Sequence, residues 1–238
     1  MWFLIETEDI PIAGMLMKLL LICGPWGSGT SAVAGLLARL GAVGFGPFFN
    51  CSDPFRPNTY ELLAFRDALD PFLSEVTLSL SSGSEKEVES SLRLLRIRIE
   101  NQEFGPYDGT APIFLKYPLS ALVIPQICNI FETRLIYVLR SLADIELTRL
   151  RRRWYAELGK QGAEVIYASM FRVLVEHAYP TMILKYTELL KASMKIAQEL
   201  VQFAELGAGP AEVQNAAAFI NSPLDKLLAR PQTEPIAT

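Results

Sequence analysis

Short apolar runs alternate with amphipathic stretches along most of the chain. Four runs have the length and residue types of buried strands: residues 18–23, 112–115, 134–139 and 181–185. A run that is apolar at nearly every position is typical of a parallel strand covered on both faces. Helical patterns separate the runs and cover residues 31–40, 58–69, 85–100, 119–131, 141–158, 163–178 and 187–206. The alternation predicts an α/β fold, a parallel sheet flanked by helices on both faces.

Glycine, proline and polar residues mark the connections between these elements. Residues 41–57 are rich in glycine, proline and phenylalanine and predict a loop that faces a site, while residues 80–84 predict a polar link. A chain of 238 residues buries one continuous core, so a single domain suffices. We expect a leader over residues 1–16, one α/β domain over 17–230 and a flexible tail over 231–238.

Composition and charge exclude several classes of protein. The formal net charge is -4, from 22 basic and 26 acidic residues, so the chain has no basic excess for a nucleic-acid partner. The apolar stretch 11–23 is shorter than the roughly 20 residues of a membrane span, and Lys18 interrupts it. We therefore expect no transmembrane segment. Any anion site must be local, built from a loop and a few basic side chains.

Cysteine and histidine usage also narrows the chemistry. Cys23, Cys51 and Cys128 are widely spaced and form no CxxC pair, which favours a reducing, cytoplasmic location. A single histidine, His177, excludes a histidine-rich metal site. We expect no metal in the protein.

One string between the first strand and the first helix has the features of a phosphate-binding loop. GPWGSGTS places glycines where a tight turn needs them and lets successive backbone amides point at an anion. In the ATPase pattern GxxxxGK[ST], Gly24, Gly29 and Ser31 match but Thr30 stands at the lysine position, which counts against γ-phosphate chemistry. A structural glycine turn is the alternative. The candidate binding residues are Gly24, Pro25, Trp26, Gly27, Ser28, Gly29, Thr30 and Ser31.

The string GPWGSGTSAVAGLLARLGA, residues 24–42, resembles the 5′-phosphosulfate loop of sulfotransferases, in which a [KR]-SGT-[ST] core opens the first helix. The likeness is to the bacterial and Golgi carbohydrate-type branch. It implies a P-loop NTPase-like fold and the sulfuryl donor PAPS (3′-phosphoadenosine 5′-phosphosulfate), which leaves PAP (adenosine 3′,5′-bisphosphate) as product. In one departure, Gly27 stands where those families usually have a basic residue.

A second phosphate site is predicted where the strand over residues 134–139 ends. An arginine at the end of a strand and a hydroxyl about two turns into the next helix can hold one phosphate together. The segment resembles the RxPxDxxxS motif of sulfotransferases, which implies that Arg140 and Thr148 bind the 3′-phosphate of PAPS. Asp144 matches, and Leu142 replaces the proline. The alternative is a surface arginine and an exposed threonine.

Lys116 is the candidate catalytic cation. FLKYPLSALVIPQI, residues 114–127, resembles the KxP…P segment of the same families. A cation at the end of a strand can stabilise the negative charge that develops on the leaving oxygen during sulfuryl transfer. The singly charged sulfuryl group does not demand a magnesium clamp, so we expect no metal requirement. The alternative is an ordinary lysine at the end of a strand.

Glu61 is the candidate general base. Cytosolic steroid and phenol sulfotransferases have a histidine base two residues after a comparable lysine, but here that position is Pro118. Residues 58–69 resemble part of a glutamate-bearing segment of bacterial relatives, which favours Glu61, with Asp53 as second candidate and His177 disfavoured. A solvent-exposed helix glutamate is the alternative.

Three further segments resemble sulfotransferases less specifically or have an ordinary structural explanation. TMILKYTELL, residues 181–190, resembles a family strand that ends in YEDL, and we interpret it as chiefly structural. Lys226 falls where relatives often complete the adenine pocket. The arginines of residues 149–153 are interpreted as a solvated helix face, or as contacts to an anionic acceptor.

Together these features predict a PAPS-dependent sulfotransferase that acts on a hydroxyl of a carbohydrate, lipid or small metabolite. A homodimer is a candidate assembly. Two alternatives stay open. One is a small P-loop nucleotide kinase, against which Thr30 counts. The other is a non-catalytic nucleotide-binding protein of the same fold, which Gly27 and the unidentified base leave open.

Overall fold

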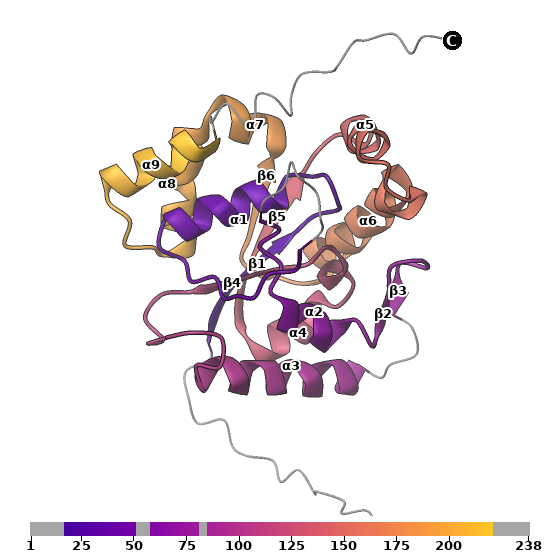
Figure 1. Cartoon of the computed structure of the whole chain (residues 1–238), viewed down its shortest axis with the longest axis horizontal. Helices are drawn as coiled ribbons and strands as arrows, with labels where there is room; N and C mark the ends of the chain where they lie inside the picture. The colour runs from indigo at the N-terminus through magenta and orange to yellow at the C-terminus, as the bar shows by residue number, and fades with distance from the viewer. Residues whose placement is uncertain (1–16, 51–57, 81–84, 221–238) are drawn as a thin grey trace, which may run out of the picture.

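The computed structural model describes residues 17–50, 58–80 and 85–220. Its centre is a parallel sheet with the strand order β4-β1-β5-β6, seen in Figure 1. The strands are β1 (Lys18–Cys23), β4 (Ile113–Lys116), β5 (Glu132–Leu139) and β6 (Thr181–Lys185). The α/β fold predicted from the alternating pattern is confirmed.

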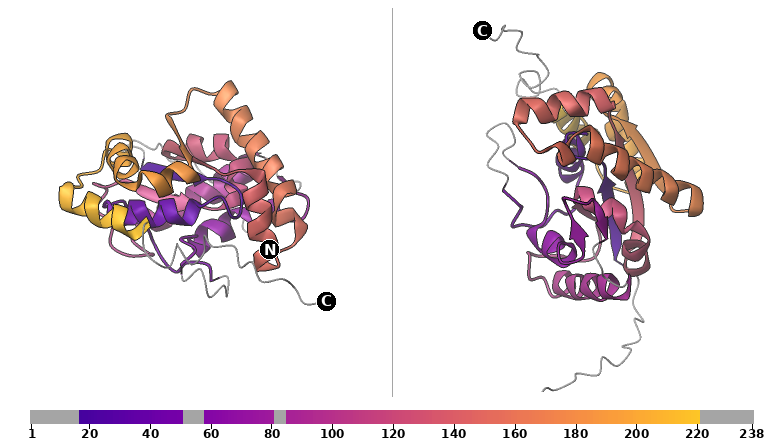
Figure 2. Two further views of the ribbon diagram at one scale, coloured as in Figure 1. Left: turned by 90° about the horizontal axis from the view of Figure 1, so that it is seen from above. Right: turned by 90° about the vertical axis from the view of Figure 1, so that its right-hand side faces the viewer.

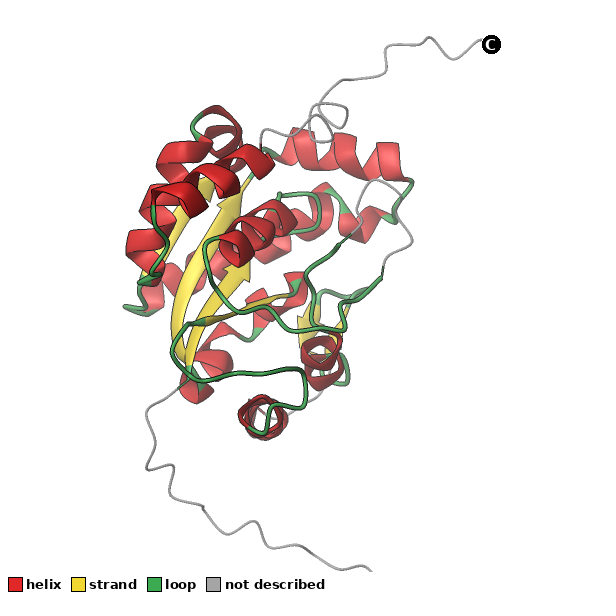
Figure 3. Cartoon of the chain, turned by 60° about the vertical axis from the view of Figure 1, so that its left-hand side comes forward, coloured by secondary structure: helices red, strands yellow, loops and turns green. Residues whose placement is uncertain are grey.

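Helices cover both faces of this sheet (Figures 2 and 3). Alternate residues of β1 enter two separate clusters, because successive side chains of a strand point to opposite faces: Leu19 and Leu21 to one, Leu20 and Ile22 to the other. The first face packs against α2 (Leu63–Leu69), α3 (Glu85–Glu100), α4 (Ile124–Ile130) and α6 (Lys160–Glu176). The second face packs against α1 (Thr30–Arg39), α8 (Ser193–Ala204) and α9 (Pro210–Ile220).

The helix expected over residues 58–69 begins only at Leu63. Before it, Tyr60 has a positive φ of 57°, and Leu62 forms an antiparallel bridge with Phe48. Residues 58–62 therefore form a non-helical segment beside the loop that follows α1. The prediction of a helix there was wrong, and the difference takes Glu61 off the helix.

Other element bounds also differ from the predictions. Residues 118–131 form a 3₁₀ turn, Pro118–Leu122, followed by α4. The helix expected to reach residue 158 is α5 (Leu142–Arg152), and it ends at Arg153, whose φ is 56°. Residues 187–206 divide at Ala192 into α7 (Tyr186–Lys191) and α8.

Four elements were not predicted: α9, the short antiparallel pair of β2 (Leu73–Ser74) and β3 (Ser79–Leu80), and the 3₁₀ turn Ala156–Leu158. The expected leader, residues 1–16, and the expected tail, residues 231–238, lie outside the described residues.

The strand order determines where a ligand fits. β4 pairs with one edge of β1 and β5 with the other, so the chain changes its direction of winding at β1. In open parallel sheets, ligands bind at the carboxyl ends of the strands, at this switch point. The relevant crevice is therefore where β1 and β5 end, at Cys23 and Leu139.

Candidate functional site

The loop predicted to bind phosphate, residues 24–31, connects the end of β1 to α1 at this crevice, and it is called the phosphate loop after that prediction. Gly27 and Gly29 have φ values of 78° and 103°, a backbone conformation that favours glycine. At Gly24 a Cβ would lie 2.7 Å from Ser28 Oγ and 2.9 Å from the carbonyl oxygen of Val138 in β5. The loop thus folds tightly over the switch point.

Arg140 follows β5 and reaches this loop. One guanidinium nitrogen donates to the carbonyl of Gly27 at 2.9 Å. The main chain of Arg140 is held by Tyr167, whose hydroxyl accepts from its N–H at 2.8 Å and donates to its carbonyl at 3.1 Å. The arginine predicted to bind phosphate therefore lies beside the predicted phosphate loop.

Thr148 lies against the same loop from α5. Ser141 caps this helix by accepting from the N–H of Asp144 at 3.1 Å. The side chain of Thr148 is buried and donates to the Asp144 carbonyl at 2.8 Å. A Cβ at Gly27 would lie 3.3 Å from the Thr148 methyl group. The structure therefore brings Gly27, Arg140 and Thr148 together, although 121 residues separate the first from the last.

Two buried polar atoms of this cluster have no hydrogen-bond partner in the described part of the chain. They are Ser28 Oγ and Arg140 Nε. A buried polar group without a partner costs about 1–3 kcal/mol, so such groups usually meet a ligand or water. A hydroxyl and a guanidinium N–H both suit an anionic oxygen. The residues present therefore fit a bound phosphate or sulfate group.

Tyr186, the first residue of α7, covers the phosphate loop from the β6 side. A Cβ at Gly29 would clash with its ring, and the Arg140 guanidinium lies 4.8 Å from the ring centroid. The sequence pattern suggested a structural role for this segment, and it did not place the ring on the loop. Two features therefore favour glycine at position 29: the positive φ of its backbone, and the ring of Tyr186, which occupies the place of a side chain.

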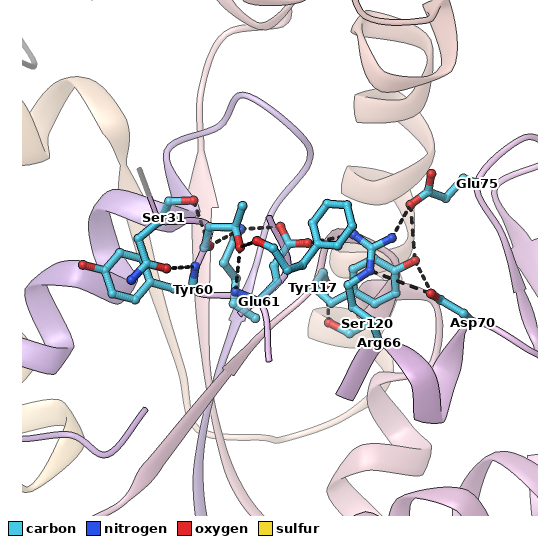
Figure 4. A network of polar contacts seen from close by, with 12 residues as sticks. Ser31, Tyr60, Glu61, Arg66, Asp70, Glu75, Tyr117 and Ser120 are labelled. Carbon is cyan, nitrogen blue, oxygen red and sulfur yellow. Dashed lines mark hydrogen bonds and ion pairs between the residues drawn. The ribbon is translucent and has the colours of Figure 1, made fainter. Parts of the chain in front are cut away.

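Lys116 and Glu61 form a buried ion pair next to the loop. Lys116 is the last residue of β4 and is 1% exposed, and Glu61 is 3% exposed. Lys116 Nζ donates to Glu61 Oε1 at 2.6 Å and to the Thr59 carbonyl at 3.0 Å. Ser31 Oγ, at the end of the phosphate loop, donates to the same carbonyl at 3.2 Å, so the pair connects to the loop (Figure 4).

The second carboxylate oxygen of Glu61 accepts from Arg66 in α2 at 3.0 Å. Arg66 also contacts Glu75 Oε1 at 3.0 Å, and its guanidinium lies 4.0 Å from the ring centroid of Phe49. Burial lowers the pKa of Arg66, but Tyr117 and the surrounding carboxylates raise it more, so it stays charged. Sequence reasoning missed Arg66, because it follows Glu61 by five residues and shares no helical face with it.

Tyr117 extends this network toward the surface. Its hydroxyl donates to Asp70 Oδ1 at 2.6 Å, and its ring lies 4.6 Å from the Arg66 guanidinium. Burial is the main reason why the pKa of Tyr117 is raised, and the bond to Asp70 adds to it. Figure 4 shows the resulting chain of contacts from Ser31 to Glu75.

Other candidates from the sequence lie elsewhere. His177 follows α6 and stacks on Tyr179. It precedes β6, so it lies near the amino-terminal ends of the strands, whereas the phosphate loop lies at their carboxyl ends. Arg149 pairs with Glu146 at 2.6 Å, and this bond lowers the pKa of the glutamate. Asp53, Cys51 and Lys226 lie outside the described residues.

The described residues contain no group of three or more histidine, cysteine, aspartate or glutamate side chains placed to hold a metal ion. Among the same residues, no helix has the length and apolar character needed to cross a membrane.

No protein-family model and no curated protein matches the sequence. Solved structures do match the fold. A sulfotransferase domain from the curacin biosynthetic pathway has a TM-score of 0.55 at 16% identity, covering 94% of this chain and 95% of that one. A sulfotransferase domain from the Synechococcus PCC 7002 olefin synthase has a TM-score of 0.53 at 13% identity, covering 94% and 92%. The chain therefore has the fold of these sulfotransferase domains.

Proposed function

We propose that this protein is a sulfotransferase that moves the sulfuryl group of PAPS to a hydroxyl of a carbohydrate, lipid or small metabolite. One observation carries the proposal. Arg140 and Thr148 lie against Gly27 of the phosphate loop at the switch point of the sheet, and two buried polar atoms there have no partner among the described residues. The fold of the two sulfotransferase domains supports the same interpretation.

In this proposal the two ends of the donor have separate sites. Backbone N–H groups of the loop after Pro25 and the hydroxyls of Ser28, Thr30 and Ser31 hold the 5′-phosphosulfate. Arg140 and Thr148 hold the 3′-phosphate. PAPS supplies the activated sulfuryl group when bound, and the buried floor formed by Cys23 and Val138 limits water beneath it.

Lys116 is the proposed catalytic cation and Glu61 the proposed base. Charge that develops on a leaving oxygen is stabilised best by a cation held in place beforehand, and Lys116 is held by Glu61 and the Thr59 carbonyl. Both oxygens of Glu61 accept from cations, which favours the ionised carboxylate. The ionised form is the one that a general base needs.

Binding of PAP without added metal tests the donor assignment. We expect PAP to raise the melting temperature more than ATP with magnesium does, because binding to the folded state alone stabilises it. Stabilisation by ATP with magnesium and none by PAP would contradict the proposal.

Arg140→Ala separates the two phosphate sites. The variant loses a charge-assisted contact worth about 1.5–3 kcal/mol. PAP affinity is expected to fall more than the affinity for adenosine 5′-phosphosulfate, which lacks the 3′-phosphate. Equal losses of affinity for both ligands, measured by calorimetry, would show that Arg140 does not bind the 3′-phosphate.

Turnover tests the two catalytic roles once a panel of hydroxyl compounds has identified an acceptor. Lys116→Ala is expected to lower turnover on the order of 10²–10³-fold with little change in PAP affinity. The defect of Glu61→Gln is expected to shrink as pH rises, because the acceptor then loses its proton more easily to solvent. A defect that does not vary with pH would assign Glu61 to holding Lys116.

The closed pair of Lys116 and Glu61 also favours a second candidate, a non-catalytic PAPS-binding protein. PAP binding without turnover across the acceptor panel would support it.

A further inference from the structure

One face of α6 is exposed and apolar. The helix lies at the outside of the molecule in both views of Figure 2, and its inner face places Ile166, Met170 and Val173 in the core. On the outer face Phe171 is 66% exposed and Val175 is 69% exposed. Large apolar side chains grouped on one helix face are typical of a surface that another protein covers.

Charged residues on the outer face of α6 stand at matching distances on either side of its middle residue, with opposite signs. α6 runs from Lys160 to Glu176, and Ala168 lies midway between its ends and is exposed. Glu164 precedes Ala168 by one helical turn and Arg172 follows it by one turn, while Lys160 and Glu176 lie two turns away. Opposite charges thus stand at equal distances on either side of Ala168.

We propose that a second copy of this chain docks on this face, with the two α6 helices antiparallel and crossing at Ala168. Residues equally far before and after the crossing point are level in such a pair, so Glu164 of each copy meets Arg172 of the other. A parallel arrangement would bring Glu164 beside Glu164. The small side chain of Ala168 permits close approach at the crossing, and Phe171 and Val165 flank it.

The charges on this face are available for a partner. Arg172 has no ion pair with any described residue. Glu164 has a weak contact with Lys160 at 3.8 Å, and both side chains are more than half exposed. The face therefore has both the acidic and the basic residue of each pair, so two copies of it are complementary in charge. This favours a copy of the same chain as the partner, because an isologous interface must be self-complementary.

The interface is small. A helix of 17 residues is about 25 Å long, so the pair buries less than the standard area of a stable complex. We therefore expect a dimer that dissociates at micromolar concentration.

Sedimentation velocity over a range of concentrations tests the proposal. Wild-type protein is expected to dimerise, and Arg172→Glu or Glu164→Arg is expected to weaken the dimer about a hundredfold or more, because like charges then face each other. The double variant Glu164→Arg/Arg172→Glu restores the opposite charges and is expected to dimerise again. Leu94→Asp, on the exposed side of α3 (59% exposed), is the matched control and is expected to dimerise like wild type.

A cysteine at the crossing point tests the geometry. Ala168→Cys places two thiols near the two-fold axis, so mild oxidation is expected to yield a covalent dimer. Lys195→Cys, at an exposed position of α8, is the control and is expected to stay uncrosslinked. A wild-type protein that stays monomeric overturns the proposal, as does a dimer that Arg172→Glu and Phe171→Asp leave intact while circular dichroism shows that both variants are folded.

Discussion

At the scale of single residues, Gly27 is the main difference between the predicted phosphate loop and the sulfotransferase loops that it resembles. Its φ of 78° favours glycine, and the Thr148 methyl group leaves little room beside its Cα. The local backbone thus accounts for glycine where those families usually have a basic residue. Arg140, the residue after β5, places a cation next to Gly27.

Gly27→Ala tests the need for this backbone shape. A side chain at positive φ costs about 1–2 kcal/mol, and the new Cβ meets Thr148 at 3.3 Å. We expect lower stability in urea unfolding and weaker PAP binding. Gly109→Ala is the control, since Gly109 has a φ of 77° with no neighbour within 4 Å, and it is expected to lose stability alone. Unchanged PAP affinity in Gly27→Ala would show that binding does not depend on the shape of the loop.

The pair of Lys116 and Glu61 places two charges in the interior. Removing one partner of a buried pair costs about 3–5 kcal/mol, because the other charge is left uncompensated. We expect Glu61→Gln to lower the free energy of unfolding by this amount. Lys116→Met combined with Glu61→Gln is expected to cost less than the two single changes summed.

The exposed pair of Arg98 and Glu103 is the matched control for this double-mutant cycle. Its side chains are 41% and 44% exposed, so Glu103→Gln is expected to change stability by less than about 1 kcal/mol. Strict additivity of the Lys116 and Glu61 variants would argue that the two side chains do not interact in solution.

At the scale of elements, a carboxylate at the end of α8 joins two strands of the sheet. Glu205 caps this helix with a φ of 54° and forms ion pairs with Lys18 of β1 and Arg134 of β5. The hydrogen bond from Lys18 is the main reason why the pKa of Glu205 is lowered, and the bond from Arg134 adds to it. Two ion pairs thus connect the end of α8 to the amino-terminal halves of β1 and β5.

The stability that Glu205 provides depends on pH. Because its folded-state pKa is below the ordinary value of 4.5, the contribution is present above pH 4.5 and is lost as pH falls through the lowered pKa. We expect the melting temperature of wild type to exceed that of Glu205→Gln at neutral pH, and the two to converge in acid. Glu132→Gln, an exposed carboxylate at the start of β5, serves as control. A difference that persists at low pH would exclude the ion pairs as its cause.

At the scale of the whole molecule, one sheet serves two hydrophobic clusters. Leu92 of α3 belongs to the cluster on one face and Leu36 of α1 to the cluster on the other, and both are fully buried. Because β1 contributes alternate side chains to both clusters, neither face can unfold and leave the other intact. The chain is therefore expected to unfold as one cooperative unit.

Leu92→Ala and Leu36→Ala test this coupling. Each is expected to lower the free energy of unfolding by about 2–5 kcal/mol, through lost burial and the cavity left behind. Tryptophan fluorescence and far-ultraviolet circular dichroism should report one coincident urea transition in wild type and in both variants. Two separated transitions in either variant would divide the molecule into independent units.

The sequence by itself predicted the parallel strands of the sheet, the glycine turn that follows the first of them, and a position for Arg140 at the end of a strand. These follow from local patterns: apolar runs predict buried parallel strands, and the carboxyl ends of parallel strands lie on one side of the sheet. The strand order of the folded protein makes β1 and β5 neighbours, and this brings Arg140 to Gly27. The glycines at positions 24, 27 and 29 are likewise explained by the turn that they form.

Only the tertiary structure decided how Glu61, Arg66 and Lys116 are arranged. Residues 58–62 have a helical pattern, but the positive φ of Tyr60 and the bridge between Leu62 and Phe48 keep them out of a helix, and Glu61 then contacts a lysine 55 residues away. Ion pairs between distant segments depend on the path of the intervening chain. The local pattern of apolar and polar residues does not predict that path. The exposure of Phe171 and Val175 is of the same kind, because which face of a helix meets the core depends on how it packs against its neighbours.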